Sequence, residues 1–201
     1  MTNSKYFTYY SYLKRESIFG YFYRRFILYP FLRTLLGPIF LDVGCGLGIF
    51  LSYGTKTLSV GLDINPYNVH HVNLSGNKAL LINPPEDFPV NKSSFPACII
   101  DQVLEHVDDP SYLISQSYNS LSPGGKLIVG LPCQKGFLAD PDHKVYYTAE
   151  SIVSTLTSST DLVHIRSFYF PINLRFVGRY LSSNHLYVVF RKPSYQSLDR
   201  L

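Results

Sequence analysis

LDVGCGLG, residues 41–48, indicates the architecture of this 201-residue chain more clearly than any other segment. The apolar residues that lead into it are typical of a buried strand, and Gly44 and Gly46 would let the backbone turn sharply and approach a ligand closely. A second apolar run, 58–62, leads directly to Asp63. A carboxylate at the end of a second strand can accept two hydrogen bonds from a ribose diol, as in nucleotide-binding Rossmann domains.

Two features of this segment favour S-adenosylmethionine (SAM) over a dinucleotide. The fingerprint GxGxxG would place its third glycine at position 49, but that residue is Ile49 and the third glycine is Gly48. Asp42 precedes Gly44 by two residues, where its charge would repel a pyrophosphate and suit the ammonium group of SAM. An NAD site and an ordinary strand–helix corner stay open as alternatives.

Strand and helix patterns alternate along the rest of the chain. Strands are expected at 39–43, 58–62, 79–82, 97–101, 126–131, 162–170 and 186–190, and helices at 47–53, 66–74, 110–121 and 148–158. A turn is expected at Pro123-Gly124-Gly125. This alternation predicts an α/β fold, with a Rossmann-like, seven-stranded, mostly parallel sheet and helices on both faces.

The N-terminal residues 1–37 are expected to form an aromatic helical cap, followed by the α/β domain at 38–201. Pro30 should end a first helix or start a second one, which Gly37 then closes. Core packing is expected for three aromatic side chains at helical spacing, Phe19, Phe22 and Phe26. The alternative is peripheral contact with a membrane surface or a lipid-linked glycan through Arg24, Arg25, Arg33 and nearby tyrosines.

Four motifs in register resemble class I SAM-dependent methyltransferases, in particular the type 11 group. They are the glycine segment with Asp42, the acid at Asp63, the run 101–107 (DQVLEHV) and the run 121–127 (LSPGGKL). The resemblance covers about residues 38–131. It implies a SAM site, with S-adenosylhomocysteine as product and no metal, formed by Asp42, Gly44, Cys45, Gly46, Gly48, Asp63, Ile64, Asp87, Phe88, Gln102 and Leu104. Pro84 and Pro85 stand where the family has an adenine-binding Asp and N–H donor, and proline has no N–H to give.

The acceptor side is predicted from a shorter resemblance. Asp140, His143, Tyr147 and Thr148 match a D-x-x-H-x-x-x-[FY]-T run of members linked to sugar and polysaccharide methylation. Methylation of a hydroxyl needs a base, and histidine titrates in the useful range. His143 is the first candidate and His106 the second, although His106 could instead orient the following helix and His143 could merely brace its loop.

Composition narrows the function further. A formal net charge of +4 with scattered basic residues does not predict nucleic-acid binding. Three widely spaced cysteines (Cys45, Cys98 and Cys133) predict neither a disulfide framework nor a zinc site, and suit the cytoplasm. We therefore expect an O-methyltransferase of a sugar or another small molecule. The alternatives are N- or C-methylation of another acceptor, a non-catalytic SAM-binding partner subunit, and an NAD oxidoreductase; the oligomeric state is not predicted.

Overall fold

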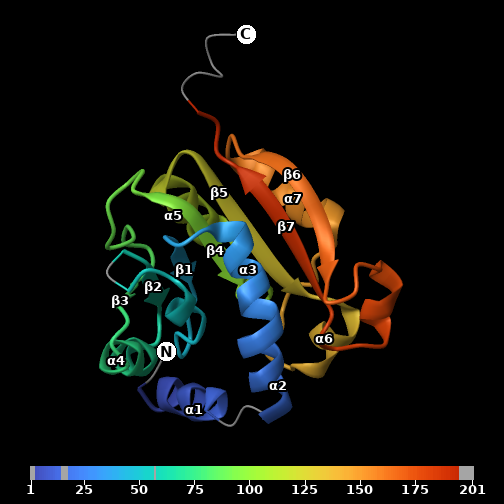
Figure 1. Ribbon diagram of the computed structural model, residues 1–201, viewed down its shortest axis with the longest axis horizontal. Coiled ribbons are helices and arrows are strands. Elements are labelled where there is room, and N and C mark those ends of the chain that lie inside the picture. The colour runs from blue at the N-terminus through green and yellow to red at the C-terminus, as the bar shows by residue number, and fades with distance from the viewer. Residues whose placement is uncertain (1–2, 15–17, 57, 195–201) are drawn as a thin grey trace. The chain divides into compact units, whose positions relative to one another are not determined.

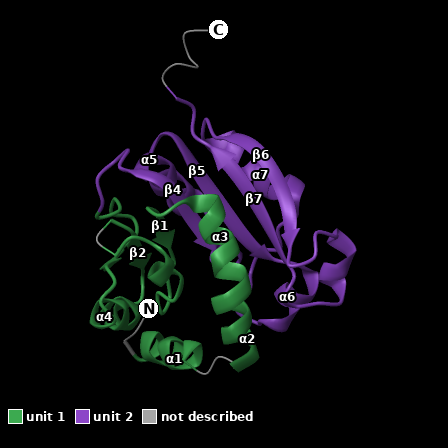
Figure 2. Cartoon of the chain, viewed as in Figure 1, with its two compact units in different colours: residues 1–89 green, residues 90–201 purple. Residues whose placement is uncertain are grey.

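Seven β-strands and the helices between them are seen in the computed structural model, which describes residues 3–14, 18–56 and 58–194. The chain divides into two units, residues 1–89 and 90–201 (Figure 1, Figure 2). The N-terminal helices fall into the first unit together with the glycine segment. The domain boundary expected after residue 37 therefore stays a sequence-based prediction.

The first unit holds three parallel strands in the order β3-β2-β1. They are β1 (Leu41–Val43), β2 (Val60–Asp63) and β3 (Ala79–Leu81). Helix α4 (Pro66–Leu74) follows β2, because the Asn65 side chain accepts a hydrogen bond from the Tyr67 N–H and Pro66 occupies the first turn. The remaining helices are α1 (Asn3–Leu13), α2 (Ile18–Tyr23), the π-helix η1 (Arg24–Leu28), α3 (Tyr29–Leu36) and the 3-10 helix η2 (Phe50–Tyr53).

Two expectations for the first unit are wrong, and one is confirmed. No helix spans 47–53; only η2 forms there, because Gly48 has a φ of 67°, which an α-helix does not allow. The aromatic side chains at 19, 22 and 26 are not core residues, since they are 85%, 52% and 64% exposed. Pro30 does start a second helix, α3, which ends at Gly37.

The second unit holds four strands in the order β4-β5-β7-β6. Strands β4 (Phe95–Asp101) and β5 (Leu121–Pro132) are parallel, and β7 (His185–Arg191) and β6 (Val163–Phe170) continue the sheet antiparallel. Helices α5 (Ser111–Ser120), α6 (Gln134–Ala139), α7 (Ala149–Ser159), η3 (Leu104–His106) and η4 (Arg175–Arg179) lie between them. With the first unit this is the predicted seven-stranded, mostly parallel Rossmann-like fold with N-terminal helices.

Local expectations for the second unit have mixed outcomes. The helix expected at 148–158 forms as α7, and Thr148 caps it in a capping box with Ser151. The expected turn at 123–125 is instead a bulge inside β5, since the pairing moves from Phe95 opposite Leu121 to Ala97 opposite Lys126. Helix α6 has no counterpart among the predicted elements.

Candidate functional site

The glycine segment forms a tight loop between β1 and η2. Gly44, Gly46 and Gly48 all have positive φ, at 79°, 53° and 67°, a region that favours glycine. Several of its N–H groups are satisfied within the unit: those of Gly44 and Cys45 donate to the Leu62 carbonyl, and that of Gly48 donates to the Cys45 carbonyl. The loop therefore does not offer the row of free helix N–H groups by which a dinucleotide site holds a pyrophosphate.

Two buried carboxylates accompany this loop. Asp42 and Asp63 are 5% and 6% exposed. Burial raises the pKa of the Cys45 thiol well above its usual value, and the charges of Asp42 and Asp63 raise it further. Both carboxylates thus place negative potential on the loop, which favours a positively charged ligand over a pyrophosphate.

Asp63 is held firmly by its own unit. Its carboxylate accepts hydrogen bonds from the Gly46 N–H at 2.8 Å, the Asn65 N–H at 2.7 Å and the Asn68 amide at 3.2 Å. Burial raises the pKa of Asp63, and these hydrogen bonds offset part of that effect. Because a carboxylate has about four acceptor positions, Asp63 has room for one further hydroxyl and not for both hydroxyls of a diol.

Helix α1 packs beside the loop within the first unit. The Asn65 amide donates to the Tyr6 carbonyl at 2.9 Å, and the Phe7 and Tyr67 rings meet edge to face at 5.5 Å. A Cβ added to Gly46 would lie 3.7 Å from the Leu13 side chain, so the C-terminal end of α1 borders the loop. The Arg25 and Arg33 side chains bond to Ser52 and to the Tyr53 carbonyl, at 2.8 and 2.7 Å. Those two charges therefore face the protein, and membrane contact stays a prediction.

The other predicted cofactor residues differ in how exposed their side chains are. Ile64 is 44% exposed directly after Asp63, Asp87 is exposed, and Phe88 is buried. In the second unit, Gln102 has a φ of 56°, which non-glycine residues rarely adopt. Its side-chain Nε2 is buried and has no hydrogen-bond partner in the described part of the chain, while Leu104 is fully buried. None of these positions is assigned to a ligand by the structure alone.

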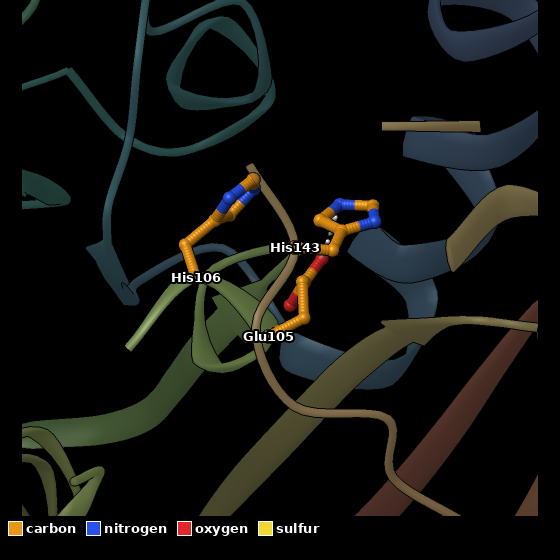
Figure 3. Close-up of side chains that lie close together, drawn as sticks. All are labelled: Glu105, His106 and His143. Atoms are coloured by element: carbon orange, nitrogen blue, oxygen red, sulfur yellow. Dashed lines mark ion pairs between the residues drawn. The ribbon is translucent and has the colours of Figure 1, made fainter. Parts of the chain in front are cut away.

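The two predicted bases come together with a residue that the sequence did not single out. Figure 3 shows the side chains of Glu105, His106 and His143, whose ligating atoms all lie within 4.8 Å of one another. The centroids of the His106 and His143 rings are 4.7 Å apart. The loop after α6 returns to η3, because the N–H groups of Lys144 and Val145 both donate to the Glu105 carbonyl, at 2.7 and 3.2 Å. This group of three is called the Glu105 cluster below.

Hydrogen bonds to backbone carbonyls fix the histidine tautomers in the cluster. The Nδ1 atom of His143 lies 2.9 Å from the Phe137 carbonyl, and that of His106 lies 3.3 Å from the Asp142 carbonyl. A carbonyl only accepts, so each neutral ring carries its proton on Nδ1 and a lone pair on Nε2. The Nε2 atom of His143 lies 3.9 Å from a carboxylate oxygen of Glu105 and 3.9 Å from one of Asp140.

Glu105 is the most perturbed group of the cluster. Its side chain is completely buried, and neither carboxyl oxygen has a hydrogen-bond partner within the described residues. Burial raises its pKa to about 8, with the charges of Asp101 and Asp140 adding to the effect. Burial also lowers the pKa of His106, as does the charge of His143. At neutral pH the cluster therefore combines a protonated carboxyl with a neutral His106.

The same three side chains are a donor set that could hold a divalent metal ion. They could equally move a proton, since a positive charge on His143 would be stabilised by the Asp140 carboxylate at 3.9 Å. The sequence places Glu105 among the polar residues of the run 101–107, next to a predicted base, but gives it no catalytic or binding role. A usable signal was its place directly after a buried strand, beside an apolar Leu104.

Comparison with known proteins finds a family match that includes residues of both units. Residues 41–129 match the methyltransferase-domain family. A ubiquinone biosynthesis O-methyltransferase of Xanthomonas oryzae pv. oryzae is 34% identical over 104 residues, which cover 47% of this chain and 43% of that enzyme. The chain spans less than half the length of the curated relatives that it matches.

Solved structures agree on the fold. A SAM-dependent methyltransferase from Archaeoglobus fulgidus aligns with 88% of this chain and 100% of that chain, with a TM-score of 0.63 and 17% identity. The geranyl diphosphate C-methyltransferase of Streptomyces coelicolor, solved with Mg²⁺, geranyl diphosphate and S-adenosyl-L-homocysteine, aligns with 82% of this chain and 76% of that chain. Its TM-score is 0.64 at 15% identity. In the described part of this chain, no helix has the length and apolar character that crossing a membrane requires.

Proposed function

We propose that this protein binds SAM at the glycine loop and transfers its methyl group to a hydroxyl of a small acceptor, a proposal supported by the match of residues 41–129 to the methyltransferase-domain family. The observation that carries the proposal is the pair of buried carboxylates, Asp42 and Asp63, beside a loop of positive-φ glycines. SAM supplies an activated methyl group on a positively charged sulfonium. The residues present fit that cofactor.

Each residue of the first unit has a role in this proposal. The glycines let the backbone come close to the cofactor, where a Cβ would intervene. Asp63 accepts a ribose hydroxyl with its remaining acceptor position, and Asp42 stabilises the ammonium group. Ile64, exposed directly after Asp63, packs against the adenosine. Pro84 and Pro85 donate no N–H, so adenine is held by packing or by Glu86 or Asp87.

In the second unit, His143 acts as the base that takes the acceptor's hydroxyl proton on Nε2. The imidazolium so formed lies 3.9 Å from Glu105 and from Asp140. The Asp140 carboxylate stabilises this positive charge while Glu105 keeps its own proton, so the only proton that moves is the one passed from the acceptor hydroxyl to His143. The His143 side chain is 8% exposed, while His106 is half-buried beside it. Only a slim group such as a hydroxyl reaches the base, and His106 borders its approach.

Sugars and other small hydroxylated molecules are the acceptors that we propose. The curated relative named as an O-methyltransferase supports oxygen as the methylated atom. The similar C-methyltransferase structure keeps carbon methylation as the second candidate. A non-catalytic partner subunit is the outcome to consider if SAM does not bind.

Calorimetric titration with SAM and S-adenosylhomocysteine tests the proposal. Saturable binding of both is expected, and Asp63→Asn should weaken it by about 1–3 kcal/mol, because a charge-assisted hydrogen bond becomes a neutral one. Asp161→Asn is the matched control, since this exposed residue lies in the second unit. If the wild-type protein binds neither molecule at millimolar concentration, the enzyme proposal fails.

A further inference from the structure

A cavity of about 230 Å³ lies in the second unit, separate in its lining from the Glu105 cluster. It is bordered by the end of β5, the start of α6, the segment before α7, β6, η4 and β7. Its lining residues are Pro132, Cys133, Gln134, Tyr146, Tyr147, Thr148, Tyr169, Arg175, Gly178, Arg179 and Leu186. Three phenol rings and two guanidinium groups give this cavity both an aromatic wall and positive charge.

The two arginines stand at the two ends of η4, Arg175–Arg179. Gly178 sets the position of this short helix, because a Cβ at 178 would collide with the Cys133 side chain. Burial raises the pKa of Tyr146, and the positive charges of Arg175 and Arg179 offset part of that increase. Both guanidinium groups therefore line the same cavity as this phenol and act on it through their charge.

Little negative charge opposes these arginines. Glu150 lies 3.6 Å from Arg175, but both side chains are well exposed, at 73% and 65%, and such pairs contribute little. Within residues 3–14, 18–56 and 58–194, Arg179 forms no ion pair. A planar guanidinium with free donors suits a carboxylate or phosphate, which it can bind through two parallel hydrogen bonds.

The cavity also adjoins the proposed base through contacts inside the second unit. The Phe137 ring stacks on His143 at 5.3 Å and meets the Tyr146 ring edge to face at 5.3 Å. Tyr147, which lines the cavity, has a pKa raised by burial and then by the charge of Glu105. The Tyr146 and Phe137 rings therefore lie between a small ligand in the cavity and His143.

We propose that this cavity binds an oxyanion, a carboxylate or a phosphate, carried by the methyl acceptor, with Arg175 and Arg179 as its ligands and the tyrosines packing against the acceptor's body. The inference rests on the proposed function in identifying the ligand as the acceptor. The binding site itself does not depend on it. Aromatic walls with a few placed charged groups are typical of ligand sites.

Calorimetric titration with phenyl phosphate, benzoate and phenol tests this site. Phenyl phosphate or benzoate should bind at least ten times more tightly than phenol, which lacks the charge, and the better of the two identifies the oxyanion. The double variant Arg175→Gln/Arg179→Gln should reduce that affinity at least tenfold. Arg166→Gln/Arg191→Gln, which removes the same two charges at exposed positions of β6 and β7 outside the cavity lining, should leave it unchanged. Circular dichroism checks that all variants fold.

Two outcomes would overturn the proposal: phenol binding as well as the charged probes, or probe binding that survives the double substitution. SAM is titrated into the same preparations to separate the two claims. Oxyanion binding without SAM binding would refute the methyltransferase function and leave the site standing. SAM binding without oxyanion binding would refute the site alone.

Discussion

Replacing Glu105 with glutamine should remove a large part of the pH dependence of stability. The carboxyl is fully buried without hydrogen-bond partners in the described residues, and burial raises its pKa from 4.5 to about 8. As pH rises through 4.5 the unfolded chain releases this proton while the folded protein keeps it. The free energy of unfolding therefore falls with pH until the folded carboxyl ionises near pH 8.

The size of the effect follows from those two pKa values. Each pH unit between them corresponds to 1.36 kcal/mol, so Glu105 lowers the free energy of unfolding by about 3 kcal/mol at pH 7 and about 5 kcal/mol above pH 8, relative to pH 4. Glutamine has no proton to release, so the variant lacks this slope. Any cost of burying its amide is the same at every pH.

Urea unfolding followed by circular dichroism at pH 5, 6, 7, 8 and 9 measures the difference. The variant should gain stability relative to the wild type as pH rises, by several kcal/mol between pH 5 and pH 9. Glu150→Gln is the control, because this side chain is 73% exposed and should show little change. Parallel curves for Glu105→Gln and the wild type would refute a protonated, desolvated carboxyl at this position.

Three further experiments address the loop and the cluster. Gly48→Ala should destabilise the protein by about 1–3 kcal/mol more than Gly76→Ala in urea unfolding. Both glycines have positive φ, but only a Cβ at position 48 would lie 2.6 Å from the Val72 side chain. Equal losses of stability in the two variants would contradict this packing argument. His143→Asn should lower turnover by a factor of about 10²–10⁴ while the Kd of SAM stays within about twofold, and His106→Asn should have the smaller effect; a greater loss for His106→Asn would reverse the two roles. Dialysis against EDTA should leave turnover unchanged, since methyl transfer from a sulfonium needs no metal. If activity is lost on dialysis and returns when a divalent ion is added, the Glu105 cluster is a metal site.

Local signals in the sequence predicted local structure well. The bounds of α4 follow from Asn65 and Pro66, and those of α7 from Thr148, because capping side chains bond to N–H groups two or three residues away. The helix expected after the glycine segment failed for a different reason. Its apolar residues fit a helix, but the positive φ of Gly48 prevents one from starting there.

The Glu105 cluster could be predicted only in part. The sequence offered both histidines as bases, but they are 37 positions apart. Their approach depends on the backbone hydrogen bonds that Lys144 and Val145 make to Glu105, which no pattern within either segment encodes. Burial of Glu105 likewise depends on the chain that returns over it. Tertiary contacts of this kind are invisible to periodicity and spacing.

The two units carry opposite electrostatic character at their candidate sites. Asp42 and Asp63 make the glycine loop of the first unit negative, and Arg175 and Arg179 make the cavity of the second unit positive. The negative loop would repel an anionic acceptor, and the positive cavity would repel a cationic cofactor. Charge alone would therefore direct each ligand to its own site. Raising the salt concentration should then weaken oxyanion binding more than SAM binding, because the arginines are exposed and the two aspartates are buried.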